Sequence, residues 1–214
     1  MRATWVIAKR EMLGFFVSPI AYIVLTTWLL YQGGVLTLLA GWFASSGRSG
    51  AATDNPLTSF FGGTIFFYAP LMVFTPVITM RLLAEERRSG TIEPLLTAPV
   101  SEVSVVLGKY LAAMVFWATL WIPTLMYAWI ISNYGDVDWG ALGATYVGIL
   151  GIGLYYMAAG TLMSALSRNQ IVAALLTFFV IGGLFVGGIG EFVVQGTDVG
   201  EVLGYISIWK HMEA

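Results

Sequence analysis

The sequence contains no cysteine and a single histidine, His211. These shortages exclude disulfide bonds, iron–sulfur clusters, thiolate zinc sites, histidine dyads and the HExxH zinc motif. Charged residues are also scarce, at 10% of the 214 residues, and the net charge is −2. A chain with this charge offers no basic surface to nucleic acid. We therefore expect no catalytic centre, no metal or cofactor site on this chain, and no nucleic-acid partner.

Hydrophobic residues are abundant instead, at 58% of the chain. The mean hydropathy is +0.82, too high for the surface of a soluble domain of this length. Apolar runs of about 20 residues match the thickness of a bilayer core. We predict an all-α, polytopic helical membrane protein that forms a single domain over residues 1–214, with five spans at about Pro19 to Gly41, Phe60 to Met80, Val103 to Ile131, Ala141 to Leu166 and Ile171 to Ile189.

The orientation follows from the basic residues, because cytoplasmic loops retain lysine and arginine. Only Arg48 and Lys210 fall on one side of the predicted spans. The other side, which we predict to be cytoplasmic, carries Arg2, Lys9, Arg10, Arg81, Arg87, Arg88, Lys109 and Arg168. This pattern indicates a multi-pass protein of the inner membrane with a cytoplasmic N-terminus.

Residues 1–18 are too short and too charged to span a bilayer. On a helical wheel their apolar residues share one arc, with Arg10 on the opposite side. The arc consists of Trp5, Ala8, Met12, Phe15 and Phe16. We expect a helix that lies in the inner membrane interface and contacts lipid.

The segment 81–102 is a charged island between two apolar runs. Gly90 is expected to end a helix, and Thr91 to cap a short helix from Ile92 to Leu96 that carries Glu93 in its first turn. Pro99 would end that helix, and Ser101 would cap the next span. A helix anchored in this way at both ends can transmit a push into the membrane.

Proline and glycine interrupt several spans. Pro70, Pro76 and Pro123 are expected to kink their helices. Two small-residue pairs favour close helix packing, namely Ala144 with Gly148 and Gly183 with Gly187. Five glycines, at 182, 183, 187, 188 and 190, are expected to stop the fifth helix early. We predict an outer, re-entrant hairpin over 187–214 that includes Gly187, Gly188, Gly190 and Glu191.

The chain has no means of its own to bind a nucleotide. Gly108 and Lys109 do not complete a Walker A motif, because Val103 stands where the first glycine is needed. An ion-coupled secondary transporter would place an ionisable group near the bilayer centre, and the span centres contain none. Sodium coordination by backbone carbonyls stays open as an alternative.

A longer motif carries a resemblance to a known family. The run Glu85, Glu86, Gly90, Thr91, Ile92, Glu93, Leu95, Leu96 and Pro99, followed by Gly108 and Lys109, resembles the signature of type-2 ATP-binding-cassette (ABC-2) exporter permeases. The resemblance covers essentially the whole chain. Within that family, the chain is most similar to the short permeases associated with gliding motility and with maturation of nitrous oxide reductase.

The resemblance implies a permease subunit driven by a separate cytoplasmic ABC ATPase, which would hold the ATP and Mg²⁺. It also implies a second permease copy or a paralogue, and a substrate path between the first, second and fifth spans. The short helix from Ile92 to Leu96 becomes the coupling helix. The ATPase-coupling residues are then Glu85, Glu86, Arg87, Arg88, Gly90, Thr91, Ile92, Glu93, Leu95, Leu96 and Pro99.

Two expectations accompany this assignment. Members of the family have six spans, so a chain with five is expected to be truncated. A scaffold subunit of a motility or cofactor-maturation assembly is the alternative to a transporter, and membrane lipid is an expected partner of either.

Overall fold

The computed structural model describes residues 2–46, 65–91, 100–133 and 137–193, and it does not describe the side chains of 2, 42–46, 65–66 and 187–193. The described part contains helices and no strand. Its elements are α1 (Arg2–Val17), α2 (Pro19–Ser46), α4 (Ile65–Thr79), α5 (Ala84–Ser89), α7 (Glu102–Trp121), the 3-10 helix η1 (Ile122–Thr124), α8 (Leu125–Ser132), α9 (Trp139–Leu166) and α10 (Gln170–Val193).

The fold confirms the prediction of an all-α polytopic membrane protein. Four helical stretches are long and apolar enough to cross a bilayer: Pro19–Gly41, Phe67–Ser89, Glu102–Ser132 and Trp139–Leu166. The fifth predicted span corresponds to α10, in which Gln170–Val186 is a shorter apolar stretch. The length of the apolar runs located these helices, because a long apolar segment has few other stable states in lipid.

Proline shapes the third span as predicted. Pro123 lies in η1, which separates α7 from α8. The Thr124 hydroxyl lies 2.6 Å from the Trp121 carbonyl oxygen and 2.7 Å from the Tyr146 hydroxyl. These bonds hold the interrupted turn against α9, so polar groups freed by the proline acquire partners inside the protein.

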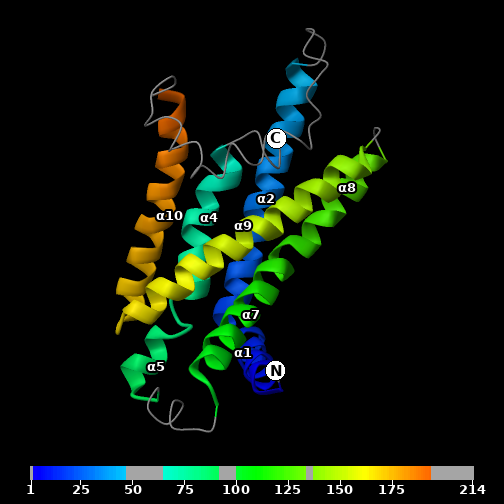
Figure 1. Cartoon of the computed structure of the whole chain (residues 1–214). Coiled ribbons are helices and arrows are strands. Elements are labelled where there is room, and N and C mark those ends of the chain that lie inside the picture. The colour runs from blue at the N-terminus through cyan, green and yellow to red at the C-terminus, as the bar shows by residue number, and fades with distance from the viewer. Residues whose placement is uncertain (1, 47–64, 92–99, 134–136, 194–214) are drawn as a thin grey trace.

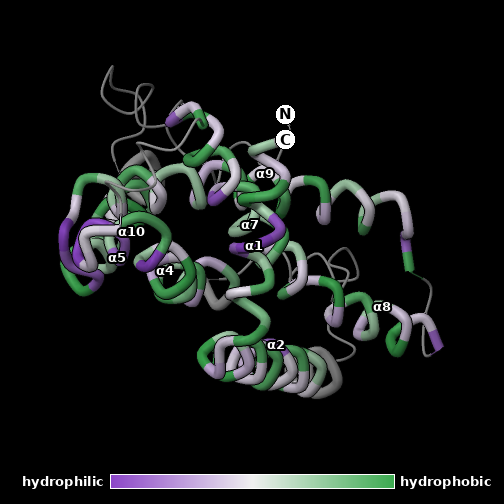
Figure 2. Tube along the Cα trace, turned by 90° about the horizontal axis from the view of Figure 1, so that it is seen from below, coloured by the Kyte–Doolittle hydropathy of each residue, from purple (hydrophilic) through white to green (hydrophobic). Residues whose placement is uncertain are grey.

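The helices form a bundle, with α1 and the short α5 at one end. α10 packs against α9 and α4, and α7 packs against α9 and α1, whereas α2 contacts α1, α7 and η1 (Figure 1). Figure 2 views the bundle from the end where α1 and α5 lie, and hydrophilic residues gather in these two elements while α2 is mostly hydrophobic. Polar and apolar parts therefore separate along the bundle axis.

An aromatic cluster joins α2 to the rest of the bundle. The centroid of the Trp28 ring lies 4.8 Å from that of Trp121 and 5.1 Å from that of Phe74, and both pairs are arranged edge to face. Phe67 also stacks near Trp121, with ring centroids 5.4 Å apart. Such pairs add about 0.5–1.5 kcal/mol each beyond area burial.

Close helix packing occurs at other small residues than the predicted pairs. A Cβ atom at Gly153 would collide with the Trp117 ring, and one at Gly160 would lie 2.7 Å from Thr79 Cβ. By contrast, Ala144 is exposed and a Cβ at Gly183 would meet nothing within 4 Å. The predictions for Ala144 and Gly183 are therefore wrong for contacts within this chain, because sequence spacing does not say which helix face meets a neighbour.

The expected glycine break in the fifth span is also wrong. α10 continues to Val193 and includes Gly182, Gly183, Gly187, Gly188, Gly190 and Glu191. In an apolar environment a helix satisfies its own backbone hydrogen bonds, and breaking it costs more than the about 1 kcal/mol by which each glycine disfavours it. The proposed hairpin thus does not begin at Gly187, and its part from 194 to 214 lies outside the described residues.

The N-terminal segment is helical, as predicted, but most of its apolar arc contacts protein. Ala8 is buried, and the Phe15 ring stacks on Phe116 of α7 with centroids 5.2 Å apart. Trp5, at 67% exposed, is the member of the arc left free for lipid. α1 is therefore docked on α7 through its apolar face.

Candidate functional site

A buried ionic cluster joins α1, α5 and α7 at the end of the bundle where the charges gather. Lys109 of α7 is only 2% exposed, and its Nζ lies 2.9 Å from Glu86 Oε1 of α5 and 3.1 Å from Glu11 Oε1 of α1. One ammonium thus holds a carboxylate from each of two other helices. The cluster connects segments that are far apart in the sequence.

Gly108 makes this arrangement possible. A Cβ atom at Gly108 would lie 2.8 Å from Ile7 Cγ2 and 3.0 Å from the Thr4 carbonyl oxygen. These distances are shorter than van der Waals contact, so only glycine lets α1 approach α7 this closely. The Gly108–Lys109 dipeptide therefore combines a close approach with the cation that ties down the approaching helix.

Arg10 completes the charge balance of the cluster. Its guanidinium lies 3.0 Å from Glu11 Oε1 and 3.8 Å from Glu86 Oε1, with 63% of the side chain exposed. Two cations then face two carboxylates, so the buried lysine is compensated. Glu86 Oε2 is buried and has no hydrogen-bond partner among the described residues.

Hydrogen bonds from α9 fix the turn between α4 and α5, residues 80–83, which we call the elbow. α5 begins after Leu83, which provides no side-chain cap. The buried Ser164 hydroxyl of α9 accepts hydrogen bonds from the Leu83 and Ala84 backbone N–H groups at 3.0 and 3.1 Å. It also donates to the Met80 carbonyl oxygen at 3.3 Å. Ser164 thus caps α5 from another helix and satisfies both sides of the turn.

The far end of α5 follows the sequence prediction. Gly90 has φ 72° and ψ 3° and ends α5 in the left-handed conformation. Ser101 caps α7, with its hydroxyl accepting from the Ser104 backbone N–H at 3.3 Å, and Glu102 lies in the first turn. Both predictions are confirmed, because these two helix ends are formed by residues adjacent to them in the sequence.

The predicted coupling residues separate into three groups. Glu85, Arg87, Arg88, Gly90 and Thr91 are exposed, and the Thr91 hydroxyl lies 2.8 Å from that of Ser89. Glu86 points inward to Lys109. Ile92, Glu93, Leu95, Leu96 and Pro99 lie outside the described residues, so the coupling helix stays a prediction.

Three residues of the site were missed by the sequence prediction: Glu11, Lys109 and Ser164. Lys109 was counted among the cytoplasmic charges and in the family signature, but no partner was assigned to it. A lysine that follows Val105, Val106 and Leu107 in an apolar helix requires a nearby carboxylate, and this requirement was the available signal. Nothing in the sequence distinguished Ser164 from other helical serines.

The described residues contain no group of three or more histidine, cysteine, aspartate or glutamate side chains that could hold a metal ion. The chemistry of the site is therefore that of ion pairs and backbone caps. It can hold α1, α5 and the start of α7 together as one body, joined to α9 through Ser164.

Comparison with known proteins places this architecture in a family. No curated protein and no solved structure matches the chain. The model of the ABC-2 family transporter proteins matches residues 22–209, which include most of the bundle and the segment that follows the elbow. The chain therefore belongs to the ABC-2 family of transporter proteins.

Proposed function

We propose that this chain is the membrane subunit of an ABC exporter driven by a separate cytoplasmic ATPase. Membership of a transporter family supports a transport role. The observation that carries the proposal is the cluster in which Lys109 joins Glu11 and Glu86, because a force applied to α5 would reach both α1 and α7 through it. The partner would bind the ATP and Mg²⁺.

The exposed face of α5 is the proposed docking surface for the ATPase. Glu85, Arg87 and Arg88 are exposed on it, while Glu86 faces inward. The coupling helix proposed for Ile92 to Leu96 would continue this surface. Charged, solvent-exposed residues suit a protein partner in water, since such residues cannot face hydrocarbon.

The arrangement of charges supports a cytoplasmic position for this end. The basic residues Arg10, Arg81, Arg87, Arg88 and Arg168 belong to α1, α5 and the turns beside them. By the positive-inside rule, these charges support our proposal that the N-terminus and α5 lie on the cytoplasmic side of the inner membrane. The chain contains no cysteine, so Thr91→Cys introduces a single label. Labelling of that cysteine from outside intact cells would contradict the proposal.

We further propose that the exporter works as a dimer with a second copy or a paralogue, because exposed large hydrophobic side chains on α2, α7, α9 and α10 leave surface for a partner within the membrane. On the sequence signature alone, we place it with the short permeases of gliding motility and nitrous oxide reductase maturation.

The test uses the full chain purified with its ATPase subunit and reconstituted in vesicles. Val186→Cys provides one label near the end of the bundle opposite to α5, at an exposed position of α10. We expect ATP to change the labelling rate in the otherwise unaltered complex, and Glu86→Gln to reduce this change while ATP hydrolysis continues. Asn133→Cys, exposed at the end of α8, serves as a second reporter.

Two results would contradict the proposal. A labelling rate that responds to an ion gradient and not to ATP would indicate a secondary transporter. Stable association with partners, without any response to ATP or to a gradient, would indicate a scaffold.

A further inference from the structure

A proline divides the third span into two parts that differ in packing. Nine of the 20 residues of α7 are buried, among them Phe116 and Trp117. Of the eight residues of α8 only Ala128 is buried, while Met126 and Trp129 are 60% and 61% exposed. An alanine buries little apolar surface, so packing holds α8 to the bundle much more weakly than α7.

The break between these two parts is anchored on its inner side. Pro123 has no backbone N–H, so the helical hydrogen bond to the Thr119 carbonyl oxygen, one turn earlier, cannot form. Thr124 is buried, and its hydroxyl lies 2.7 Å from the Tyr146 hydroxyl of α9. A 3-10 turn inside a long helix often marks a hinge. Because η1 itself is bonded to α9, a bend at this place would move α8 and leave α7 where it is.

A side-chain hydrogen bond ties α8 to α2. The Tyr127 hydroxyl donates to the Leu29 carbonyl oxygen at 3.1 Å. Gly33, one turn further along α2, leaves room for this hydroxyl, since a Cβ atom there would lie only 3.3 Å from it. A Cβ atom at the neighbouring Gly34 would meet nothing within 4 Å. The surface of α2 is therefore shaped to receive the tyrosine hydroxyl at this position.

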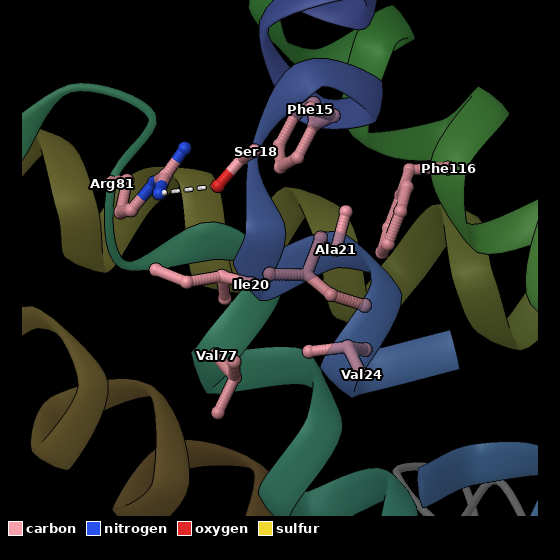
Figure 3. A pocket seen from close by; sticks show the side chains of 9 residues that line it. Phe15, Ser18, Ile20, Ala21, Val24, Val77, Arg81 and Phe116 are labelled. Carbon is pink, nitrogen blue, oxygen red and sulfur yellow. Dashed lines mark hydrogen bonds between the residues drawn. The ribbon is translucent and has the colours of Figure 1, made fainter. Parts of the chain in front are cut away.

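The start of α2 is held firmly by the rest of the bundle. Ala21 and Val24 are buried there. Together with Phe15 of α1, Val77 of α4 and Phe116 of α7, they surround one small hollow (Figure 3). These contacts fix α2 to three other helices, so α2 is the stationary side of the contact with Tyr127 and α8 is the side that is free to move.

We propose that α8 is a hinged arm, which η1 joins to α7 and which the Tyr127 hydroxyl latches to α2. With the latch closed, the arm is bonded to α2 and lies towards the end of the bundle away from α5 (Figure 1). With the latch open, the arm bends about η1 and parts from α2, so it acts as a gate between the first and third spans. Its eight residues form a lever of about 12 Å, and a bend of about 20° moves its tip by about 4 Å. The inference requires only the fold and is independent of the proposed ATPase.

The experiment measures the distance between nitroxide labels on α2 and α8 by pulsed electron paramagnetic resonance, with the full chain in lipid nanodiscs. The chain contains no cysteine, so Leu38→Cys and Asn133→Cys, both at exposed positions, place one label on each helix. We expect one narrow distance distribution in this background, and an added population about 4 Å longer when Tyr127→Phe is introduced. Tyr22→Phe, at an exposed position of α2, is the matched control and should leave the distribution unchanged.

Further variants separate the latch from the hinge. Gly33→Ala displaces the Tyr127 hydroxyl and should also lengthen the distance, by less than Tyr127→Phe does, whereas Gly34→Ala should not. Pro123→Ala restores the missing N–H group, so adding it to Tyr127→Phe should return a single narrow distribution. Thermal unfolding verifies that each variant is folded. Three results would each overturn the inference: an unchanged distribution in Tyr127→Phe, equal effects of Gly33→Ala and Gly34→Ala, or a longer population that persists after Pro123→Ala is added.

Discussion

Replacing Lys109 by methionine tests the physical basis of the proposed coupling site. Methionine keeps an unbranched side chain of similar length and removes only the charge and its hydrogen bonds. The variant would leave Glu11 and Glu86 beside each other without the ammonium that now lies 3.1 and 2.9 Å away. We expect a large loss of stability, because removing one partner of a buried ion pair leaves the other charge without compensation.

The structure sets the size of the effect. Lys109 is 2% exposed, whereas the side chains of Glu11 and Glu86 are 21% and 16% exposed and keep some hydration. Removing one partner of a buried pair costs about 3–5 kcal/mol, and the residual hydration favours the lower end, about 3 kcal/mol. Arg10 still pairs with Glu11 at 3.0 Å but lies 3.8 Å from Glu86. Most of the loss should therefore come from Glu86.

The assay is denaturant unfolding of the purified chain in detergent. Adding Glu86→Gln to Lys109→Met should recover about 1–2 kcal/mol, and adding Glu11→Gln should recover less, because Arg10 already compensates Glu11. Arg10→Gln alone is the control. It should cost less than about 1 kcal/mol, because Arg10 is exposed and exposed ion pairs contribute little to stability. A loss below about 1 kcal/mol for Lys109→Met, or equal recovery by both glutamine variants, would refute the reasoning.

Three further substitutions test the elbow and the helix contacts by the same unfolding assay. Ser164→Ala leaves two buried N–H groups without an acceptor and should cost about 2–4 kcal/mol, whereas Ser132→Ala, which loses only a bond within its own helix, should cost less than about 0.5 kcal/mol. Gly160→Ala drives a methyl group into the Thr79 side chain and should cost about 1–3 kcal/mol. The added methyl group of Gly151→Ala meets nothing within 4 Å, so this variant should stabilise the chain by up to about 1 kcal/mol. Gly90→Ala should cost about 1–2 kcal/mol, because its φ of 72° disfavours a side chain. Equal effects within either matched pair, or a neutral Gly90→Ala, would contradict the corresponding contact.

The sequence predicted the features that depend on neighbouring residues. The Ser101 cap, the left-handed Gly90 and the break at Pro123 are confirmed. Each of these follows from local backbone chemistry or from the length of an apolar run. The family signature was also readable, because it is a local motif.

The tertiary structure decided which helix faces meet. Glycine spacing predicted close contact at Ala144 and Gly183, but the bundle uses Gly153 and Gly160, where Trp117 and Thr79 approach. The glycines of α10 were expected to end the helix, yet it continues to Val193. Spacing gives periodicity along one helix, and it contains no information about the rotation of that helix against its neighbours.

Sequence alone thus determined that the chain enters the membrane as helices, that α5 ends at Gly90 and that Ser101 caps α7, since these features depend on short stretches of the chain. Only the tertiary structure showed that Lys109 holds Glu11 and Glu86, and that Ser164 caps α5. These partners are brought together by packing from distant parts of the chain. A charged residue in an apolar helix indicates that a partner of opposite charge is needed, but the fold decides which residue is that partner.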